Sequence, residues 1–304
     1  AAQRYARAIV ETLSAQTPEG YVFRVDLRLR PASEVSPLAI PLGAAITHYE
    51  SSALAWERAA FIRARAAAGD SAAGEDFLDA ISPFVWRRSL DFGAIDDIRR
   101  LTLRIRDAHS GPRTPGPGYD VKRGRGGIRE AEFFAQTHQL IHGGRHPDLR
   151  LRGTRAALDA LAEEGIVAAE DARALGEAYD RLRTIEHRLQ MVDDRQTHSL
   201  PADAAALDNV ARLDGLADGA ALVAELRELC GMVGERYDSL LGDGDDTTRS
   251  HVDVPADLRE KIEQRAAHWR DTIRSLRGAE ARAAFRAMLP DLMEALAEAP
   301  EPDR

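Results

Sequence analysis

The chain has 304 residues, with 41 Lys and Arg against 50 Asp and Glu and a formal net charge of -9. At about 100–200 residues per domain, this length predicts roughly two domains. The single cysteine, Cys230, excludes a disulfide framework and a cysteine-based zinc site. No apolar run approaches the roughly 20 residues of a membrane span, and the acidic total argues against extensive nucleic-acid binding. We therefore expect a cytoplasmic protein that contacts neither a membrane nor nucleic acid.

One segment, residues 21–30, has the alternation of a β-strand, with apolar residues on one face and charged residues on the other. The charged face contains Arg24, Asp26, Arg28 and Arg30. A single strand is not stable alone, so this one is expected to have sheet partners. A helical pattern over residues 2–13 precedes it without an initial Met. We interpret Ala1 as the cut end of a longer protein.

The remainder of the chain has helical periodicity, so the predicted fold is mainly α. Within residues 171–192, for example, apolar residues recur at the spacing of one helix face. We expect Thr154 to cap the helix that follows it. The predicted helices are 46–67, 77–90, 95–108, 128–141, 154–164, 171–192 and 222–241, and helical periodicity resumes at residue 258.

The charged face of residues 21–30 has two interpretations. A half-exposed strand commonly presents mixed charges to solvent. Alternatively, Asp26 binds a divalent cation, which prefers oxygen ligands, while Arg28 and Arg30 neutralise phosphoryl charge. On the predicted helix 46–67, Trp56 and Arg63 are seven residues apart and share a face. Arg58 and Arg65 do the same, which is typical of a core tryptophan with a solvated charged flank.

A basic, glycine-rich loop precedes the predicted helix 128–141. It contains Lys122, Arg125, Gly126 and Gly127. The free N–H groups of a helix N-terminus attract anions, and glycine permits a close approach of the backbone. The loop has no Gly-Lys-Ser/Thr and follows no strand, so it matches neither a Walker nor a dinucleotide fingerprint. An anion site and a simple loop-to-helix junction both remain open.

The histidines give little indication of a metal site. Glu186 and His187 are adjacent on a predicted helix, where neighbouring side chains point about 100° apart and cannot easily share one ion. His142 and His146 have no evident third ligand. No arrangement of Ser, His and Asp suggests a nucleophilic centre.

Taken together and in order, these segments resemble the glutamine synthetase adenylyltransferases, bifunctional enzymes that attach AMP to glutamine synthetase and remove it. The first shared string is Val-Asp-Leu-Arg-Leu-Arg-Pro at residues 25–31. Any one string alone is weak, but six in order are specific, and they extend from about Arg24 to about Leu213. The other strings are 56–58 with 63–65 and 69–70, 83–88, 126–133, 139–145, and 186–190 with 196–201.

The resemblance implies a function and a set of site residues. Residues 84–91 and 128–130 resemble the adenylyl-removing half, which uses phosphate to release AMP from a tyrosine as ADP. Asp26 matches the third metal-binding aspartate of such nucleotidyltransferases, which would hold Mg²⁺ or Mn²⁺. Arg28 and Arg30 would flank the phosphoryl groups of ADP, ATP or phosphate. The residues expected to bind nucleotide or phosphate are Lys122, Arg125, Gly126, Gly127, Arg63 and Arg65.

The chain departs from the family pattern in one respect. The Gly-Ser and Asp-x-Asp that supply the first two metal ligands do not precede Tyr21, so we expect this chain alone to be inactive. The expected domains are a remnant of a polymerase-β-like α/β catalytic domain (1–45), a helical domain of the uridylyl- and adenylyltransferase type (46–241), and a linker with the start of a further helical region (242–304).

The partners that the resemblance implies are glutamine synthetase and the PII nitrogen-signalling protein. Two alternatives remain open. The chain could be a uridylyltransferase of the nitrogen-signalling protein, a class that shares the helical region, although the strings at 25–31 and 56–58 argue against it. It could also be a non-catalytic helical module that binds a regulatory partner.

Overall fold

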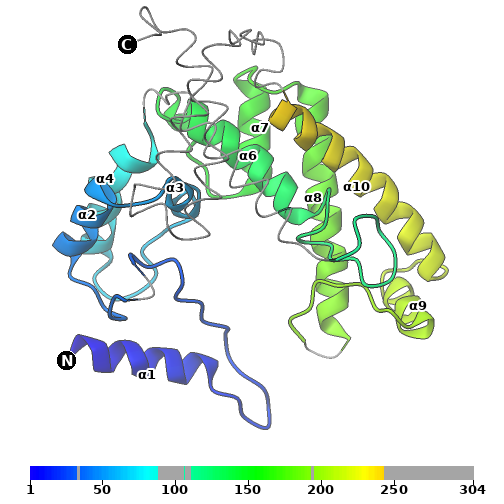
Figure 1. Cartoon of the computed structure of the whole chain (residues 1–304), viewed down its shortest axis with the longest axis horizontal. Coiled ribbons are helices and arrows are strands. Elements are labelled where there is room, and N and C mark those ends of the chain that lie inside the picture. The colour runs from blue at the N-terminus through cyan, green and yellow to red at the C-terminus, as the bar shows by residue number, and fades with distance from the viewer. Residues whose placement is uncertain (33–34, 88–105, 107–110, 193–194, 243–304) are drawn as a thin grey trace, which may run out of the picture. The chain divides into compact units, whose positions relative to one another are not determined.

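The computed structural model describes residues 1–32, 35–87, 106, 111–192 and 195–242 (Figure 1). The chain divides into two compact units, residues 1–241 and 242–304, and the second unit, including the predicted linker, lies outside the described residues apart from Gly242. The described part is mostly helical, which confirms the predicted mainly α class. Its elements are α1 (Ala2–Ser14), α2 (Leu42–Ser51), α3 (Ala55–Phe61), α4 (Ser71–Val85), α6 (Ile128–His142), η1 (Pro147–Leu149), α7 (Thr154–Glu163), α8 (Ala169–Met191), α9 (Ala204–Leu213) and α10 (Gly219–Gly242).

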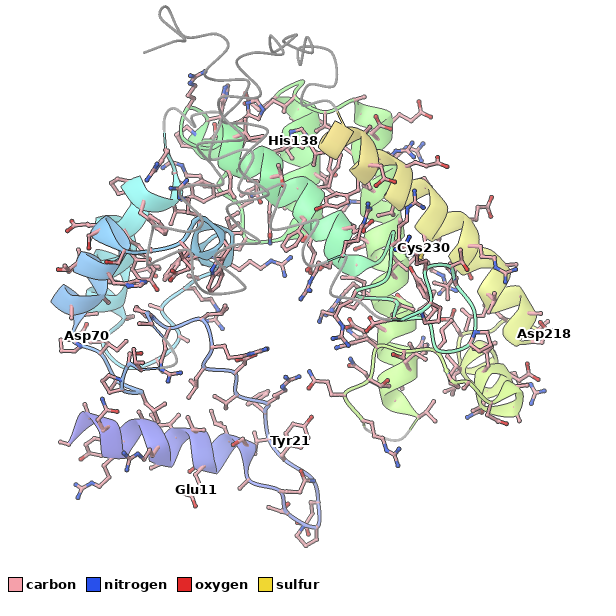
Figure 2. All side chains as sticks on the ribbon, in the orientation of Figure 1. Glu11, Tyr21, Asp70, His138, Asp218 and Cys230 are labelled. Carbon is pink, nitrogen blue, oxygen red and sulfur yellow. The ribbon has the colours of Figure 1, made fainter. Side chains whose placement is uncertain are left out.

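Two hydrophobic clusters share helices α6, α8 and α10 (Figure 1). One cluster also includes α9 and contains Cys230 of α10 (Figure 2), and the other includes α7. The apolar stripe predicted on 171–192 faces both clusters, since Leu175, Leu182 and Ile185 on α8 are fully buried. Each such side chain contributes about 1.5–3 kcal/mol on burial. The predicted helices 128–141, 171–192 and 222–241 are thereby confirmed as α6, α8 and α10.

A second group of aromatic side chains joins α2, α3 and α4. Tyr49 on α2 is buried, and its ring packs edge to face against Phe61 at 4.7 Å between centroids. Phe77 and Phe84 on α4 approach the same ring at 6.2 and 5.5 Å. Arg58 lies over Phe84, with its guanidinium carbon 5.2 Å from the ring centroid, a favourable cation–π distance.

The predicted strand is wrong. Among the described residues there are two isolated bridges, Thr17 with Gly20 and Asp120 with Ser199, and no strand. Residues 21–27 form no ladder, and the side chains of Val22 and Phe23 are exposed. Alternation predicts which face each side chain would take, but a strand forms only against a partner, and no described segment pairs with this one. The α/β remnant predicted over 1–45 therefore stays a prediction.

The helix predicted over 46–67 is also wrong in its extent. It consists of α2 and α3, which are separated at residues 52–54, and α3 ends at Phe61. The Glu57 side chain accepts a hydrogen bond from the N–H of Leu54 at 2.9 Å, which satisfies a donor at the start of α3. This local cap fixes a new helix start within an otherwise continuous helical pattern.

Other helices also differ from expectation in their start, their cap or their presence. The helix predicted over 77–90 is α4, which begins earlier because the Asp70 side chain caps it by accepting from the N–H of Ala73 at 3.0 Å. Thr154 does not cap α7; Gly153 precedes that helix, and Thr154 is its first residue. Helix α9 was not predicted, and the helix predicted over 95–108 lies outside the described residues except for Arg106. Of the described helices, none combines the length with the apolarity that a membrane crossing needs.

Candidate functional site

Asp26 and Arg28 form a close ion pair with each other. The Asp26 carboxylate accepts hydrogen bonds from Nε of Arg28 at 3.0 Å and from Nη2 at 2.6 Å, and also from the Arg28 backbone N–H at 3.0 Å. The hydrogen bonds from the Arg28 side chain are the main reason that the pKa of Asp26 falls to about 2. Asp26 is therefore ionised at neutral pH, but both of its oxygens already contact a cation.

Arg28 and Arg30 line a pocket of about 380 Å³ with residues of α2 and α3. Nη1 of Arg30 donates to the Leu27 carbonyl at 2.6 Å, which holds the side chain on its own loop. The buried Glu57 also lines this pocket, and its carboxylate lies 3.2 Å from Nε2 of His48. The other lining residues are Ala32, Val35, Ser52, Leu54 and Trp56.

The pocket thus joins two of the sequence motifs, the 25–31 string and the Trp-Glu-Arg string at 56–58. Its two arginines can neutralise an anionic group, and its apolar residues can exclude water around it. His48 is a lining residue that the sequence interpretation missed, because no motif marks it.

The described residues do not fit a divalent cation at Asp26. Groups of three or more His, Cys, Asp or Glu side chains close enough to hold a metal are absent from the described part of the chain. A Mg²⁺ or Ca²⁺ site usually needs several oxygen ligands, whereas Asp26 stands alone and is paired with Arg28. No catalytic step through a metal can be derived from these residues.

Arg63 lies beyond the end of α3, so the helical spacing that paired it with Trp56 does not apply. Its Nη2 donates to Oγ1 of Thr154 at 2.6 Å and to Oε1 of Glu132 at 3.1 Å, which ties this segment to α7 and α6. Arg65 is exposed, and no carboxylate among the described residues pairs with it.

The glycine-rich loop is packed against the protein rather than open. Gly126 has φ +75°, and a Cβ atom there would lie 1.8 Å from the carbonyl oxygen of Cys230 on α10. At Gly124 a Cβ would lie 2.5 Å from the Tyr119 ring, and at Gly127 it would lie 2.6 Å from the Val121 carbonyl oxygen. The glycines are required by these close approaches within the fold.

The N–H groups that an anion would need are already bonded. Gly126 donates to Oε2 of Glu130 at 2.7 Å, and Gly127 donates to the Gly124 carbonyl at 3.0 Å. The first two residues of α6, Ile128 and Arg129, donate to backbone carbonyls at 3.0 Å. The backbone geometry therefore favours the loop-to-helix junction over the anion site, and any anion would depend on the side chains of Lys122 and Arg125.

Lys122 and Arg125 both face carboxylates. Nη2 of Arg125 lies 2.6 Å from Asp238 on α10, and Arg106 lies 2.6 Å from the other oxygen of the same carboxylate. Nζ of Lys122 lies 3.5 Å from Oε1 of Glu186. These contacts connect the loop to α10 and α8.

Glu186 is the centre of a buried ion cluster that the sequence interpretation did not identify. Its carboxylate is fully buried and contacts Lys122, Arg183 and, at 2.8 Å, Nδ1 of His198. Burial and the charge of Lys122 lower the pKa of His198. His187 is exposed whereas Glu186 is buried, so the side chains of these two adjacent residues point in different directions, as predicted. The cluster explains the position of Glu186 in its motif without a metal.

The segment that carries Asp26 lies close to this region. Arg24 donates to the side-chain oxygen of Gln196, which belongs to the string following α8. Burial and the positive charges of Arg123 and Arg28 lower the pKa of Arg129 at the start of α6. Positive charge from the 25–31 string and from the glycine-rich loop therefore acts on Arg129. Arg129 belongs to a motif that the sequence analysis singled out, although it was not selected as a site residue.

Comparison with known proteins identifies two matching families. Residues 2–80 match the family described as glutamate-ammonia ligase adenylyltransferase, and residues 100–241 match the GlnD PII-uridylyltransferase family. The second match covers the helical region that the two enzyme classes were expected to share.

Curated relatives match nearly the whole chain. A bifunctional glutamine synthetase adenylyltransferase/adenylyl-removing enzyme of Bradyrhizobium diazoefficiens is 42% identical over 99% of this chain, which corresponds to 32% of the relative. Enzymes of the same name from Caulobacter vibrioides and Rhizobium meliloti are 51% and 49% identical over 70% and 78% of the chain, or 22% and 24% of their own lengths. The chain spans about a third, at most, of the curated relatives it matches. These matches confirm the resemblance that the six motifs predict.

Proposed function

From its relationship to the bifunctional glutamine synthetase adenylyltransferases, we propose that this chain forms part of such an enzyme and contributes to its adenylyl-removing reaction. In that reaction, an oxygen of phosphate attacks the phosphorus of the AMP group, and the bond between this phosphorus and the tyrosine oxygen breaks. The products are ADP and the unmodified tyrosine of glutamine synthetase. The observation that carries the proposal is the identity of 42% over 99% of the chain. The pocket that joins two family motifs through Arg28 and Arg30 supports it.

The arginines have a direct role in this proposal. Attack by phosphate brings two negatively charged groups together, so cationic side chains must reduce their repulsion. Arg28 is 80% exposed at its side chain and can move from Asp26 to an incoming phosphoryl group. Arg30, held by the Leu27 carbonyl, would act as a fixed charge at the pocket wall. Arg65, Lys122 and Arg125 stay proposed contacts for nucleotide or phosphate.

We further propose that the chain alone does not catalyse AMP removal. The family resemblance assigns a divalent cation to Asp26, but Asp26 has no companion ligands among the described residues and is paired with Arg28. A phosphorolysis assay with adenylylated glutamine synthetase, phosphate and Mg²⁺ or Mn²⁺ tests this, and ADP production by the purified chain would contradict it.

The role of Asp26 is tested in a chimera in which this chain replaces the matching third of the Bradyrhizobium enzyme. Asp26→Asn should abolish AMP removal and leave AMP attachment intact, because the two reactions are assigned to different halves. Glu11→Gln, an exposed change on α1, is the matched control. If the Asp26→Asn variant still removes AMP at the unchanged rate, the role assigned to Asp26 is wrong. If the chimera with the unmodified chain neither attaches nor removes AMP, the proposal that this chain forms part of such an enzyme is wrong.

The match of residues 100–241 to a uridylyltransferase family supports a second candidate. In that case the acceptor would be the PII protein and the donor UTP. The chimera is incubated with labelled ATP or labelled UTP and with either glutamine synthetase or PII as the acceptor. Labelling of glutamine synthetase from ATP supports the adenylyltransferase, and labelling of PII from UTP supports the uridylyltransferase. Regulatory binding of PII and a cytoplasmic location belong to the first proposal, in which the chain is part of a glutamine synthetase adenylyltransferase.

A further inference from the structure

His48 differs chemically from the other residues that line the pocket at Arg28 and Arg30. Imidazole is the side chain that commonly exchanges a proton near neutral pH. Arginine does not release its proton in this range. Apart from Glu57, the remaining described lining residues carry apolar groups, a hydroxyl or an indole. Glu57 is therefore the one other described group to consider as a proton donor in this pocket.

The carboxylate of Glu57 is already committed to other groups. Its Oε1 accepts a hydrogen bond from the N–H of Leu54 at 2.9 Å, at the start of α3. Its Oε2 and Oε1 lie 3.2 and 3.4 Å from Nε2 of His48, in the last turn of α2. Because carboxylate oxygens accept hydrogen bonds, Nε2 carries a hydrogen that faces Glu57. The Glu57 side chain is 7% exposed, so a buried, anchored carboxylate fixes the orientation of the imidazole ring.

The second ring nitrogen of His48, Nδ1, is left for a ligand. Among the described residues, Glu57 bonds to Nε2 and none bonds to Nδ1. The His48 side chain is 18% exposed, so the ring is accessible from the pocket. A carboxylate bound to one imidazole nitrogen holds the tautomer in which the other nitrogen exchanges a proton with a substrate.

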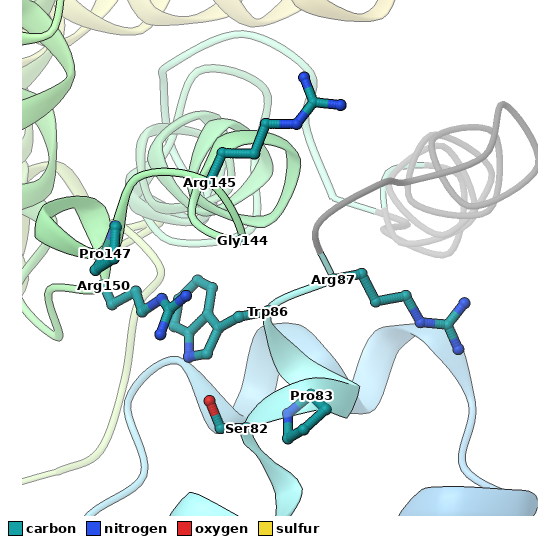
Figure 3. Close-up of a pocket in the computed structure, with 8 residues that line it drawn as sticks. All are labelled: Ser82, Pro83, Trp86, Arg87, Gly144, Arg145, Pro147 and Arg150. Carbon is teal, nitrogen blue, oxygen red and sulfur yellow. The ribbon is translucent and has the colours of Figure 1, made fainter.

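A second pocket, of about 750 Å³, lies between the end of α4 and the connection from α6 to α7, and it offers no such group (Figure 3). Its described lining residues include no His, Asp, Glu, Lys, Tyr or Cys. Its cations are also dispersed, because Arg87 points away from Arg150 and Trp86 (Figure 3). Of the two pockets, as far as their described lining goes, the one at Arg28 and Arg30 presents the proton donor.

We propose that His48 donates the proton at Nδ1 to the tyrosine oxygen that leaves during AMP removal, and that Glu57 positions its ring. This inference rests on the proposed function. A pocket of about 380 Å³ has the size of a site for one small ligand. The groups that line it can therefore contact a single bound phosphoryl-tyrosine, with the arginines at the phosphoryl oxygens and His48 at the leaving oxygen.

The proposed step balances in atoms and charge. A bond forms between an oxygen of phosphate and the phosphorus of AMP, and the bond between this phosphorus and the tyrosine oxygen breaks. The electron pair of the broken bond stays on the tyrosine oxygen, which takes the proton from protonated His48. The products are ADP, a neutral tyrosine hydroxyl and a neutral imidazole, which regains a proton from solvent.

The test uses the chimera with the Bradyrhizobium enzyme. His48→Gln should slow AMP removal about 100-fold, because the glutamine amide can still donate to Glu57 but cannot transfer a proton. AMP attachment should be unchanged, which reports that the protein folds. His146→Gln is the matched control, since His146 also pairs with a carboxylate, Glu164 at 2.9 Å, but is exposed and does not line this pocket.

A second substrate separates proton donation from a structural role. In this substrate the modified tyrosine of glutamine synthetase is replaced by difluorotyrosine, whose more acidic oxygen leaves without needing a proton. His48→Gln should regain at least about tenfold of its lost rate on this substrate. Glu57→Gln, which keeps an acceptor for Leu54 but loses the charge, should show a smaller loss with the same recovery.

The outcomes distinguish this inference from the proposed function. If the unmodified chimera removes AMP and His48→Gln does so equally fast, the inference is wrong and the proposed function stands. A loss that difluorotyrosine does not restore also overturns the inference, because it indicates a structural role for His48. If the unmodified chimera does not remove AMP, both proposals are wrong.

Discussion

Replacing Gly126 with alanine should destabilise the protein far more than the same change at Gly165, where an added Cβ meets no neighbouring atom. Gly126 has φ +75°, and an added Cβ would lie 1.8 Å from the carbonyl oxygen and 2.7 Å from Cα of Cys230. Both atoms belong to the backbone of α10, and Cys230 is buried in the core. The clash cannot be relieved by a side-chain rotation, so the loop or the helix must shift.

The magnitude follows from two contributions. A non-glycine residue in the left-handed region costs about 1–2 kcal/mol. Forcing an extra methyl group into a packed interior typically costs about 1–3 kcal/mol more. We therefore expect Gly126→Ala to lower the free energy of unfolding by about 2–5 kcal/mol. For a domain of this size, that corresponds to a fall in melting temperature of about 5–15 °C.

Gly165→Ala provides the matched control. Gly165 also has positive φ, +67°, but a Cβ there would meet no atom within 4 Å. Both substitutions reduce the flexibility of the unfolded chain alike, so their difference isolates the contact with α10. Thermal unfolding followed by circular dichroism measures both variants. Equal losses of stability in the two would show that the loop does not pack on α10 and would reopen the anion-binding interpretation of its glycines.

Two further changes test the buried polar groups. Glu186→Gln removes the charge at the centre of the buried ion cluster and should lower the free energy of unfolding in urea by about 2 kcal/mol. Glu177→Gln, in an exposed pair on α8, should lower it by less than about 0.5 kcal/mol. Similar losses in the two variants would mean that the cluster is not buried. Burial and His142 lower the pKa of His138 to about 4, so between pH 6.5 and 4 the unfolded state binds more protons and stability rises with pH. Lowering the pH from 7 to 5 should therefore cost about 2 kcal/mol more in the parent chain than in His138→Gln, and identical pH profiles would contradict the burial of this histidine.

Periodicity predicted the helices whose apolar stripes face the two hydrophobic clusters. On α8, Leu175, Leu182 and Leu189 recur at helical spacing and are buried together, so the local pattern and the tertiary packing agree. The same method failed at residues 46–67, where the composition stays helical but Glu57 caps a new helix start at Leu54. A cap is a single side-chain contact, and it leaves no periodic signal.

The strand predicted over 21–30 failed for a different reason. Alternation is a property of the segment, whereas pairing depends on a second segment that the local sequence does not specify. The full set of residues that line the pocket at Arg28 could not be predicted either, because His48 of α2 lines it but belongs to no recognisable motif. Sequence could nevertheless select Arg28 and Arg30, because both belong to the string at 25–31.

Several family motifs contact one another, and these contacts explain some motif residues without a bound ligand. Arg63 donates to Glu132, and Trp86 fits against Gly143. Such contacts give these residues a packing role that does not require a bound nucleotide. The same reasoning applies to the glycine-rich loop, because the N–H groups of residues 126–129 at the start of α6 all donate to acceptors within the fold. Among the residues of these motifs, Arg28 and Arg30 line the pocket formed with α2 and α3 and are therefore the cations best placed to meet a phosphoryl group.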